Sequence, residues 1–251
     1  MSTNSIGGTQ AVARSAALLR EIAASPGGAS LADLALRLEL ERPTAYRILQ
    51  RLVVEGLVEQ DPARRSYTLG PLLYELGLAA KPPKHLQIRA REVLMTLARE
   101  SGDTVFAIAP SGNDSLCIDR QEGDYPVKAL LMGVGRRRPL GTGSGSLALL
   151  SAMPEDRVQE ILALNQVRLQ ANGESSITEL TAAIAQARQD GFVMRAPKDA
   201  PEILSLAIPV CNSYGTPVLA LSISALNFRI QHRRDFLLKL LNEARQLVHM
   251  H

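Results

Sequence analysis

The chain has 251 residues, of which 46% are hydrophobic and 21% charged, and its formal net charge is +3. A chain of this length forms one large domain or two small ones with an adequate core. Such a small net charge is no argument for nucleic-acid binding, which has to be judged from where the cations are placed.

The cysteines and the apolar stretches exclude further classes. Cys117 and Cys211 lie far apart, without Cys or His at metal-ligand spacing, so neither a zinc site nor a disulfide framework is expected. The most apolar stretch, 203–226, is broken by prolines and a glycine, and the N-terminus has no basic segment leading into an apolar run. We therefore expect a cytoplasmic protein without a signal peptide or membrane span.

Two helices are predicted in the first 40 residues. Apolar residues recur at helical spacing over 10–24. Ser30, with Asp33 three residues further on, resembles a capping box and predicts a short second helix from Leu31. The inward positions of this helix would be Leu31, Leu34, Ala35 and Leu38.

A third helix follows almost at once and ends at Gly56. Pro43 suits its first turn, and the apolar residues from Ala45 to Val53 fall on one arc of a helical wheel. The opposite arc carries hydrogen-bond donors without a carboxylate, as a helix that enters the DNA major groove requires. The predicted DNA contacts of this helix are Arg42, Thr44, Tyr46, Arg47, Gln50 and Arg51. For a lone helix, the alternative of an ordinary solvated surface would be favoured.

The segment after Gly56 favours DNA binding over the alternative of an ordinary solvated helix surface. Residues 57–60 and 66–69 have the pattern of two short strands, and the turn between them carries Arg64 and Arg65. An isolated amphipathic helix does not require two arginines at a turn, whereas a wing that lies on the phosphate backbone does. The pattern therefore predicts a winged helix-turn-helix DNA-binding domain over 10–70.

Residues 71–85 are predicted to be a linker helix, and residues 86–251 a second domain. The linker has a helical pattern over 71–81, and two prolines then break the chain. In the second domain, helices are expected at 86–101, 146–152, 154–164, 178–190 and 236–248, and strands at 104–110, 115–120, 127–132, 204–211 and 218–224. Antiparallel strands with helices outside them make an α+β domain.

Four stretches carry a resemblance to a known family. In chain order they are ERPTAYRILQRLVVEGLVE, YTLGPLLYELG, GRRRPLGTGSGSLALL and LSLAIPVCNSYGTPVLALSIS. At this spacing the chain resembles the IclR family of bacterial transcriptional regulators, from about Gln10 to the C-terminus. The resemblance implies a GAF-like α+β effector-binding domain that takes a small organic acid. It also implies a homodimer or homotetramer that binds a palindromic double-stranded DNA operator.

The chain departs from the family pattern in both domains. Pro43-Thr44 stands where members usually have Ser-Thr at the start of the reading helix, so one donor is lost. The loop of the second domain commonly reads Pro-Leu-His with a later Gly-Lys, whereas this chain has Pro139-Leu140-Gly141 and Gly145-Ser146. The difference predicts a looser, glycine-richer pocket wall.

Glycines alternate with hydroxyl residues over 141–146, directly before an apolar helix. Glycines expose backbone amides, and the helix start adds partial positive charge, so a carboxylate would bind well there. The stretch is not a P-loop, because no Gly-Lys-Ser/Thr occurs. A flexible connector with an ordinary helix cap is the alternative.

Ser222 and Ser224 alternate with apolar residues, so both hydroxyls face one side of a strand. The resemblance implies that these serines line an effector pocket with Ser205 and the glycine-rich loop. The predicted effector-binding residues are Leu140, Thr142, Gly143, Ser144, Gly145, Arg195, Ser205, Ser222 and Ser224. The alternative for Ser222 and Ser224 is a pair of surface or cross-strand hydroxyls. Solvated positions are favoured for Arg195 and for the arginines of 136–138.

These features favour a ligand-responsive transcriptional regulator that needs no cofactor. Its effector would act by binding one arrangement of the oligomer better than another. A small-acid hydrolase fused to a DNA-binding head is the alternative, but no histidine lies beside the serine-rich loop and no catalytic constellation is found. A third possibility is an oligomeric DNA-binding protein whose pocket is vestigial.

Overall fold

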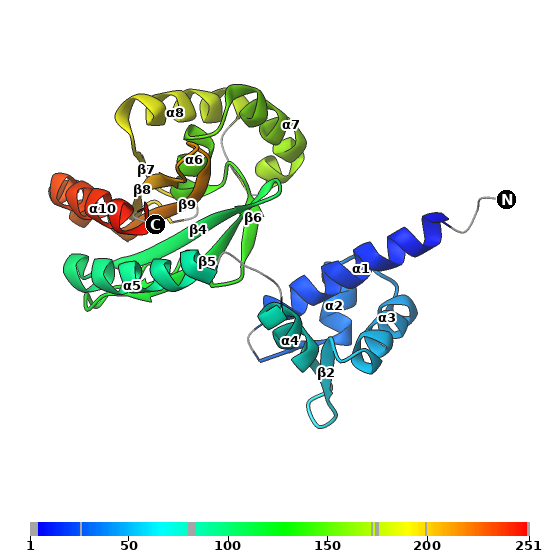
Figure 1. Cartoon of the computed structure of the whole chain (residues 1–251). Coiled ribbons are helices and arrows are strands. Elements are labelled where there is room, and N and C mark those ends of the chain that lie inside the picture. Colours follow the sequence, from blue (N-terminus) through cyan, green and yellow to red (C-terminus); the bar gives the residue numbers. More distant parts are fainter. Residues whose placement is uncertain are drawn as a thin grey trace. The chain divides into compact units, whose positions relative to one another are not determined.

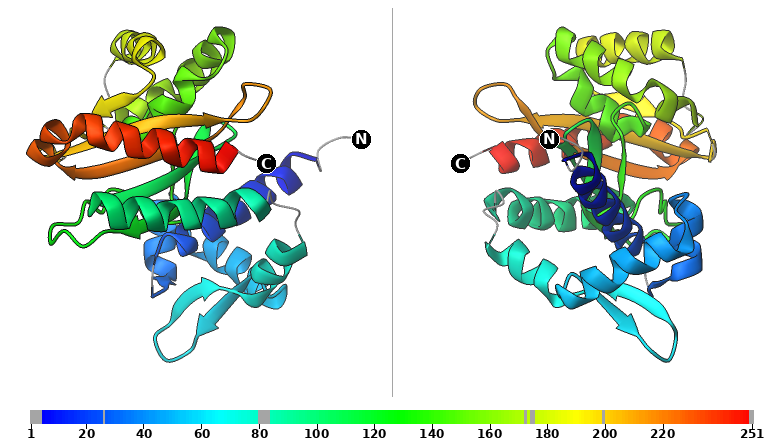
Figure 2. Two further views of the ribbon diagram at one scale, coloured as in Figure 1. Left: turned by 60° about the vertical axis from the view of Figure 1, so that its left-hand side comes forward. Right: turned by 90° about the vertical axis from the view of Figure 1, so that its right-hand side faces the viewer.

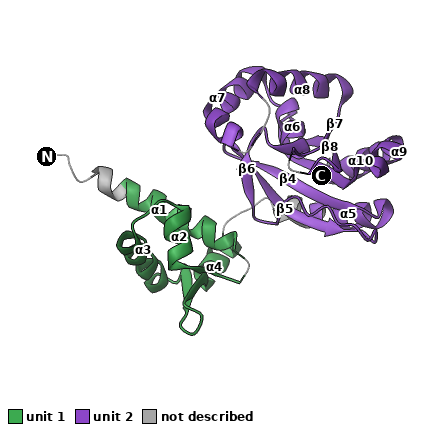
Figure 3. Ribbon diagram, turned by 180° about the vertical axis from the view of Figure 1, so that it is seen from behind, with its two compact units in different colours: residues 1–83 green, residues 84–251 purple. Residues whose placement is uncertain are grey.

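The computed structural model describes residues 5–25, 27–79, 84–171, 173, 176–198 and 200–249. They belong to two compact units, Met1–Pro83 and Lys84–His251 (Figure 3). Among the described residues, no helix combines the length and the apolar character that crossing a bilayer requires.

The first unit is a winged helix-turn-helix, as predicted (Figure 1). Its elements are α1 (Ser5–Ala23), β1 (Ala29–Ser30), α2 (Leu31–Arg37), α3 (Arg42–Val54), β2 (Val58–Asp61), β3 (Ser66–Leu69) and α4 (Pro71–Ala79). The three strands form an antiparallel sheet with β3 in the centre. The strand β1 was not predicted, because two residues are too few to show an alternating pattern.

The start of α2 follows the predicted cap. Ser30 Oγ accepts a hydrogen bond from the backbone N–H of Asp33 at 3.1 Å, which satisfies one of the free donors of the first turn. A small core lies beneath the helices and the sheet, and its fully buried members include Leu18, Leu34 and Leu49. This core fixes the orientation of α3, whose outer face is then free to contact another molecule.

The second unit is an α+β domain built on a six-stranded sheet. The strands are β4 (Thr104–Ser111), β5 (Asp114–Glu122), β6 (Arg137–Pro139), β7 (Val193–Arg195), β8 (Ile203–Cys211) and β9 (Pro217–Leu226). They lie in the order β6-β5-β4-β9-β8-β7, and every neighbouring pair is antiparallel. The first strand of the domain, β4, and its last strand, β9, are therefore neighbours at the centre of the sheet.

Helices pack on both faces of this sheet. One face packs against α5 (Lys84–Ser101) and α10 (Arg234–His249), which Figure 2 shows side by side. The other face packs against α6 (Gly143–Ser151), α7 (Glu155–Ala171) and α8 (Ile177–Asp190). Along β9, Leu221 and Ile223 face the core beneath α5 and α10. Ser222 and Ser224 therefore face the opposite side, which α6 covers. The short helix α9 (Asn227–His232) leads into α10.

Two parts of the predicted secondary structure were wrong or missing. Residues 127–132 form an irregular segment instead of a strand. The backbone of this segment is hydrogen-bonded by side chains, because Ala129 N–H donates to Thr104 Oγ1 at 3.1 Å and the Leu131 carbonyl accepts from Arg138 at 2.7 Å. The elements β6, β7 and α9 were not predicted, since all three are too short to show a periodic pattern.

Candidate functional site

The outer face of α3 carries the predicted DNA-contacting side chains. Ala45, Leu49 and Leu52 are buried and anchor the helix. The predicted contacts Arg42, Tyr46, Arg47 and Arg51 are exposed, and Thr44 and Gln50 are half-buried. We call these six residues the reading surface. The structure thus presents cations and other donors together on one exposed helix face.

Two contacts modify this reading surface. Arg51 forms an ion pair with Glu55 one turn further along. The charge of Arg51 is therefore less available than that of Arg47. Gln50 Nε2 donates to Gln60 Oε1 at 3.4 Å, a long hydrogen bond that joins α3 to strand β2.

The turn between β2 and β3 is organised by one carboxylate. Asp61 Oδ1 accepts hydrogen bonds from the backbone N–H groups of Ala63 at 2.8 Å and Arg64 at 3.0 Å. Arg65 adopts a left-handed conformation with φ of 51°. Both arginine side chains are exposed. The fixed turn holds two cations at the tip of the wing, where phosphate contacts are expected.

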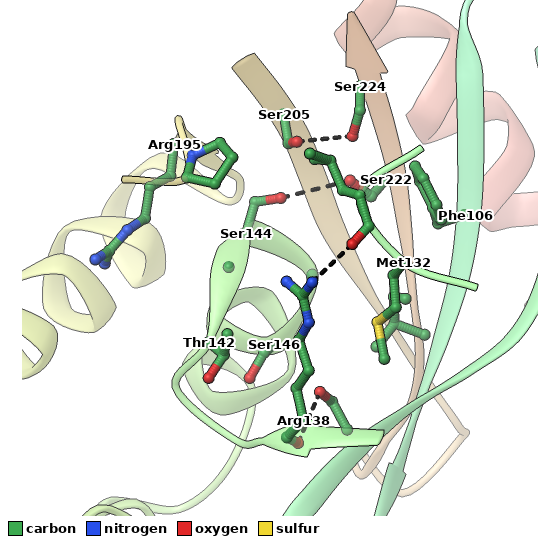
Figure 4. Close-up of a pocket in the computed structure, with 16 residues that line it drawn as sticks. Phe106, Met132, Arg138, Thr142, Ser144, Ser146, Arg195, Ser205, Ser222 and Ser224 are labelled. Carbon is green, nitrogen blue, oxygen red and sulfur yellow. Dashed lines mark hydrogen bonds between the residues drawn. The ribbon is translucent and has the colours of Figure 1, made fainter. Parts of the chain in front are cut away.

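In the second unit, the predicted effector residues converge on a cavity of about 70 Å³ (Figure 4). Its walls come from the sheet, from the start of α6 and from the irregular segment before β6. The lining residues are Phe106, Ile108, Ser115, Leu131, Met132, Arg138, Thr142, Gly143, Ser144, Gly145, Ser146, Arg195, Pro197, Ser205, Ser222 and Ser224.

Four buried serines form two hydrogen-bonded pairs at this cavity. Ser144 Oγ and Ser222 Oγ are 3.4 Å apart, and Ser205 Oγ and Ser224 Oγ are 2.7 Å apart. Within each pair one hydroxyl donates to the other, which leaves one O–H group per pair available to a ligand. Ser224 is therefore a cross-strand hydroxyl that bonds from β9 to β8, whereas Ser222 bonds to the start of α6, and both residues line the cavity.

The start of α6 offers further donors to the cavity. Thr142 is the N-cap residue, yet its hydroxyl makes no capping hydrogen bond. Its Oγ1 is buried and has no hydrogen-bond partner among the described residues. Gly141 N–H donates to Ser146 Oγ at 2.6 Å, and a Cβ on Gly141 would lie 2.9 Å from Leu169 Cδ2. The tight loop thus leaves a helix N-terminus and an unused hydroxyl beside the cavity.

The interpretation of Arg138 as a solvated turn residue was wrong. Arg138 is half-buried and lines the cavity. Its Nη2 donates to the Leu131 carbonyl at 2.7 Å, and its own carbonyl accepts from Ser115 Oγ at 3.2 Å. The neighbouring Arg137 instead pairs with Asp114 at 3.1 Å. Three adjacent arginines look alike in sequence, and only the pairing of β6 with β5 distinguishes them.

Of the predicted effector residues, Leu140 lies outside the cavity, and Arg195 takes the outward direction that was favoured for it. Leu140 is fully buried in the core beside α6 and α7, and its side chain does not line the cavity. Arg195 borders the cavity, but Figure 4 shows its guanidinium directed away from the serines. The lining residues that sequence reasoning missed are Phe106, Ile108, Ser115, Leu131, Met132, Arg138, Ser146 and Pro197. Ser146 belongs to the glycine-rich stretch 141–146 that was considered for a carboxylate, and Arg138 and Pro197 are each close in the chain to a predicted residue, but the other five lie apart from the predicted residues and gave no signal of a shared site.

The other reactive groups among the described residues do not gather into a second site. Burial raises the pKa of the Cys117 thiol to about 11, so this thiol stays protonated at neutral pH. Burial also raises the pKa of Cys211. Within the described ranges, no three His, Cys, Asp or Glu side chains gather as a metal site would require.

A winged helix-turn-helix with exposed cations, followed in the same chain by a domain with a polar cavity, defines a DNA-binding regulator with a C-terminal effector domain. Residues 82–249 match the family described as bacterial transcriptional regulator IclR C-terminal, and residues 11–62 match the IclR helix-turn-helix domain. The protein therefore belongs to the IclR family of transcriptional regulators.

Relatives with assigned names agree with this membership. The chain is 32% identical over 185 residues to the HTH-type transcriptional regulator Rv1719 of Mycobacterium tuberculosis, covering 74% of this chain and 70% of the relative. It is 26% identical over 230 residues to the transcriptional repressor AllR of Escherichia coli, covering 90% and 84%. These relatives are regulators of transcription, and the chain accordingly belongs to a family of regulators and not of enzymes.

Solved structures share the fold over nearly the whole chain. An IclR transcriptional regulator from Alicyclobacillus acidocaldarius matches with a TM-score of 0.77 at 24% identity, covering 95% of this chain and 97% of that one. An IclR homolog from Microbacterium hydrocarbonoxydans, in complex with 4-hydroxybenzoate, matches with a TM-score of 0.75 at 22% identity, covering 95% and 97%.

Proposed function

We propose that this protein binds a palindromic DNA operator as a homodimer or homotetramer in the cytoplasm, and that a small organic acid in its cavity changes the affinity for that operator. Residues 10–70 would bind DNA, 71–85 would link the domains, and 86–251 would bind the effector and form the oligomer. The alternative of a vestigial cavity remains as an outcome of the test below.

The observation that carries the effector proposal is the unused hydroxyl of Thr142. A buried hydroxyl without a partner costs free energy, on the order of 1–3 kcal/mol, so a ligand that hydrogen-bonds to it would be stabilised. The N-terminus of α6 and the guanidinium of Arg138 border the same cavity. Both favour a negatively charged ligand. The relative from Microbacterium hydrocarbonoxydans has an aromatic acid bound, which is consistent with such a ligand.

On the DNA side, we assign different roles to the helix and to the wing. Arg47 and the other members of the reading surface would contact base edges in the major groove. Arg64 and Arg65 would contact phosphates, which position the domain but carry no sequence information. This division predicts that substitutions in α3 change specificity, whereas substitutions in the wing change affinity for all sequences.

The effector can regulate only by a difference in affinity. An acid that binds equally well to the DNA-bound and free arrangements of the oligomer would shift neither population. Because DNA and effector are bound by separate units, the coupling has to be measured as a change in DNA affinity. By linkage, DNA would change the affinity for the acid by the same factor.

The experiment is a fluorescence-anisotropy titration of the full chain with duplex DNA from upstream of its own gene, with and without a panel of aliphatic and aromatic acids. We expect binding tighter than to random DNA, and a shift with one class of acid. The Ser222→Ala, Ser224→Ala double variant should bind the same DNA without responding to acid. A Ser151→Ala variant is the control, because Ser151 Oγ donates to the Ala148 carbonyl within α6 and Ser151 does not line the cavity.

Three results would count against the proposal. Binding no better than to random DNA would reject this operator assignment. Tight operator binding that no acid shifts, together with no thermal stabilisation by any acid, would support the vestigial cavity instead. A double variant that still responds would place the effector elsewhere.

A further inference from the structure

The strand register places Arg138, Ser222 and Ser224 at successive levels along the strands of the sheet. Ser224 lies opposite Thr104 on β4, and Ser222 lies opposite Phe106. Arg138 pairs with Ser115 on β5, which in turn pairs with Pro110 on β4. At about 3.3 Å per residue, the backbone of Arg138 is about 13 Å from the level of Ser222, and Ser224 is about 7 Å beyond that.

Figure 4 shows the same order in the side chains. The guanidinium of Arg138 reaches from its strand toward the Ser144–Ser222 pair, and the Ser205–Ser224 pair lies on the far side of that pair. The cavity therefore has a cationic end and a hydroxyl end, separated by the level of Ser222.

The charges of the lining favour one place for a carboxylate. The cavity lining contains no Asp or Glu among the described residues, and of its two arginines only Arg138 directs its guanidinium toward the serines. A carboxylate buried at the Ser205–Ser224 pair would meet neutral hydroxyls alone, which compensate poorly for its lost hydration. Beside Arg138 it would form a charge-assisted hydrogen bond.

The hydroxyl end suits an uncharged oxygen. The Ser205–Ser224 pair uses one O–H group internally at 2.7 Å and retains one donor and several acceptor lone pairs. A hydroxyl or carbonyl oxygen on the ligand satisfies that donor without bringing a charge. Between the two ends, Phe106, Ile108 and Met132 supply apolar walls for a hydrocarbon spacer.

Building on the proposed effector cavity, we propose that Arg138 selects the carboxylate of the effector and that the Ser205–Ser224 pair selects a second, uncharged oxygen at the opposite end. The effector class is then an elongated hydroxy or oxo acid, with its two polar ends separated by an aromatic ring or an extended chain. A short acid, or one whose oxygens all lie at one end, can bind Arg138 or the Ser205–Ser224 pair but not both.

The test uses pairs of acids that differ by the distal oxygen, namely 4-hydroxybenzoate against benzoate and 6-hydroxyhexanoate against hexanoate. Calorimetry on the full chain would measure each dissociation constant. For at least one pair, we expect the hydroxylated acid to bind about tenfold more tightly, as one satisfied buried hydrogen bond provides. Ser224→Ala should abolish that preference while leaving the affinity for the unhydroxylated acid within about twofold.

Substitution of the cation should give the opposite pattern. Arg138→Gln should weaken both acids of the pair by about tenfold or more and keep the preference for the distal oxygen. Arg137→Gln is the matched control, because it removes the neighbouring positive charge, which pairs with Asp114 outside the cavity lining. Arg137→Gln should leave the affinity for both acids of the pair unchanged. Circular dichroism and melting temperature would establish that each variant is folded.

The outcomes separate this inference from the proposed function. If acids bind the wild type but no pair shows a preference, or if Ser224→Ala weakens both members of a pair equally, the assignment of the two ends is wrong while the effector cavity stands. If Arg138→Gln and Arg137→Gln have equal effects, Arg138 does not select the carboxylate. If none of the four acids binds the wild type, the effector class proposed here is rejected, and the wider acid panel on DNA binding tests the cavity separately.

Discussion

The two units of this protein place their polar groups in opposite ways. In the DNA-binding unit, the arginines of α3 and of the wing are exposed, and the buried residues beneath them are apolar. In the effector unit, four serines are buried in pairs, and the half-buried arginines Arg138 and Arg195 line the same cavity. The first unit offers charge to a partner in water, whereas the second offers mainly neutral donors in a partly open cavity.

The difference suits the two proposed ligands, a DNA duplex and a small acid. A DNA duplex is a dense array of charges with released counterions, so exposed arginines bind it strongly without being desolvated beforehand. A small acid has one charge and little surface, so its binding depends on a few hydrogen bonds made away from water. The same chain therefore needs an exposed surface for DNA and an enclosed one for an effector.

The largest effect should come from the core beneath the reading surface. Leu49 is fully buried on α3, so Leu49→Ala should reduce the free energy of unfolding of the first unit by about 2–5 kcal/mol and weaken DNA binding as a consequence. Urea unfolding followed by far-UV circular dichroism measures this change. Val54→Ala, at a 73% exposed position of the same helix, should stay within about 0.5 kcal/mol. Equal losses would mean that α3 is not anchored by this core.

Arg47→Ala tests the surface without disturbing the core. Because Arg47 is exposed, its replacement should leave the unfolding free energy nearly unchanged, yet weaken operator binding by about 1–3 kcal/mol if it contacts a base edge. Anisotropy titration measures the affinity, with Arg91→Ala, an exposed arginine of the other unit, as the control. An unchanged affinity would remove Arg47 from the reading surface.

The salt dependence of the affinity should distinguish DNA binding from effector binding. Arg64→Ala combined with Arg65→Gly, chosen because φ at residue 65 is positive, should reduce the slope of log affinity for DNA against log salt by about 2. Operator and random DNA should be affected alike. Effector binding, measured over the same salt range, should change much less because its charged contact is partly buried. A wing variant with an unchanged slope would contradict the phosphate contacts.

The smallest effect concerns the effector unit at high pH. Burial raises the pKa of Cys117 from 9.0 to about 11, so the folded state holds its proton more tightly than the unfolded state. The contribution of the Cys117 thiol to the free energy of unfolding is fully present below pH 9 and declines as the pH rises through 11. Compared with the wild type, Cys117→Ala should lose less stability across this window in urea unfolding. Parallel curves for the two proteins would show that the thiol has the same pKa in the folded and unfolded states.

Local patterns predicted most of the elements because the signals lie within a few residues. Ser30 with Asp33 marked the start of α2, and alternation along β9 placed Ser222 and Ser224 on one face. The segment 127–132 shows the limit of this reasoning. Its apolar residues suit a strand, but side chains from β4 and β6 take its backbone hydrogen bonds. Those partners are invisible to a local pattern.

The sequence by itself determined the helix-turn-helix and the basic wing, since each rests on residues that are close together in the chain, and the family, since each of its four stretches is a continuous motif. Only the tertiary structure decided how the cavity is composed. Ser144 meets Ser222 across 78 positions of sequence, and Arg138 faces the cavity because β6 pairs with β5 in one register while Arg137 turns to Asp114. Helix and strand periods follow from local sterics, whereas the sharing of one cavity by distant segments follows from the packing of the whole sheet.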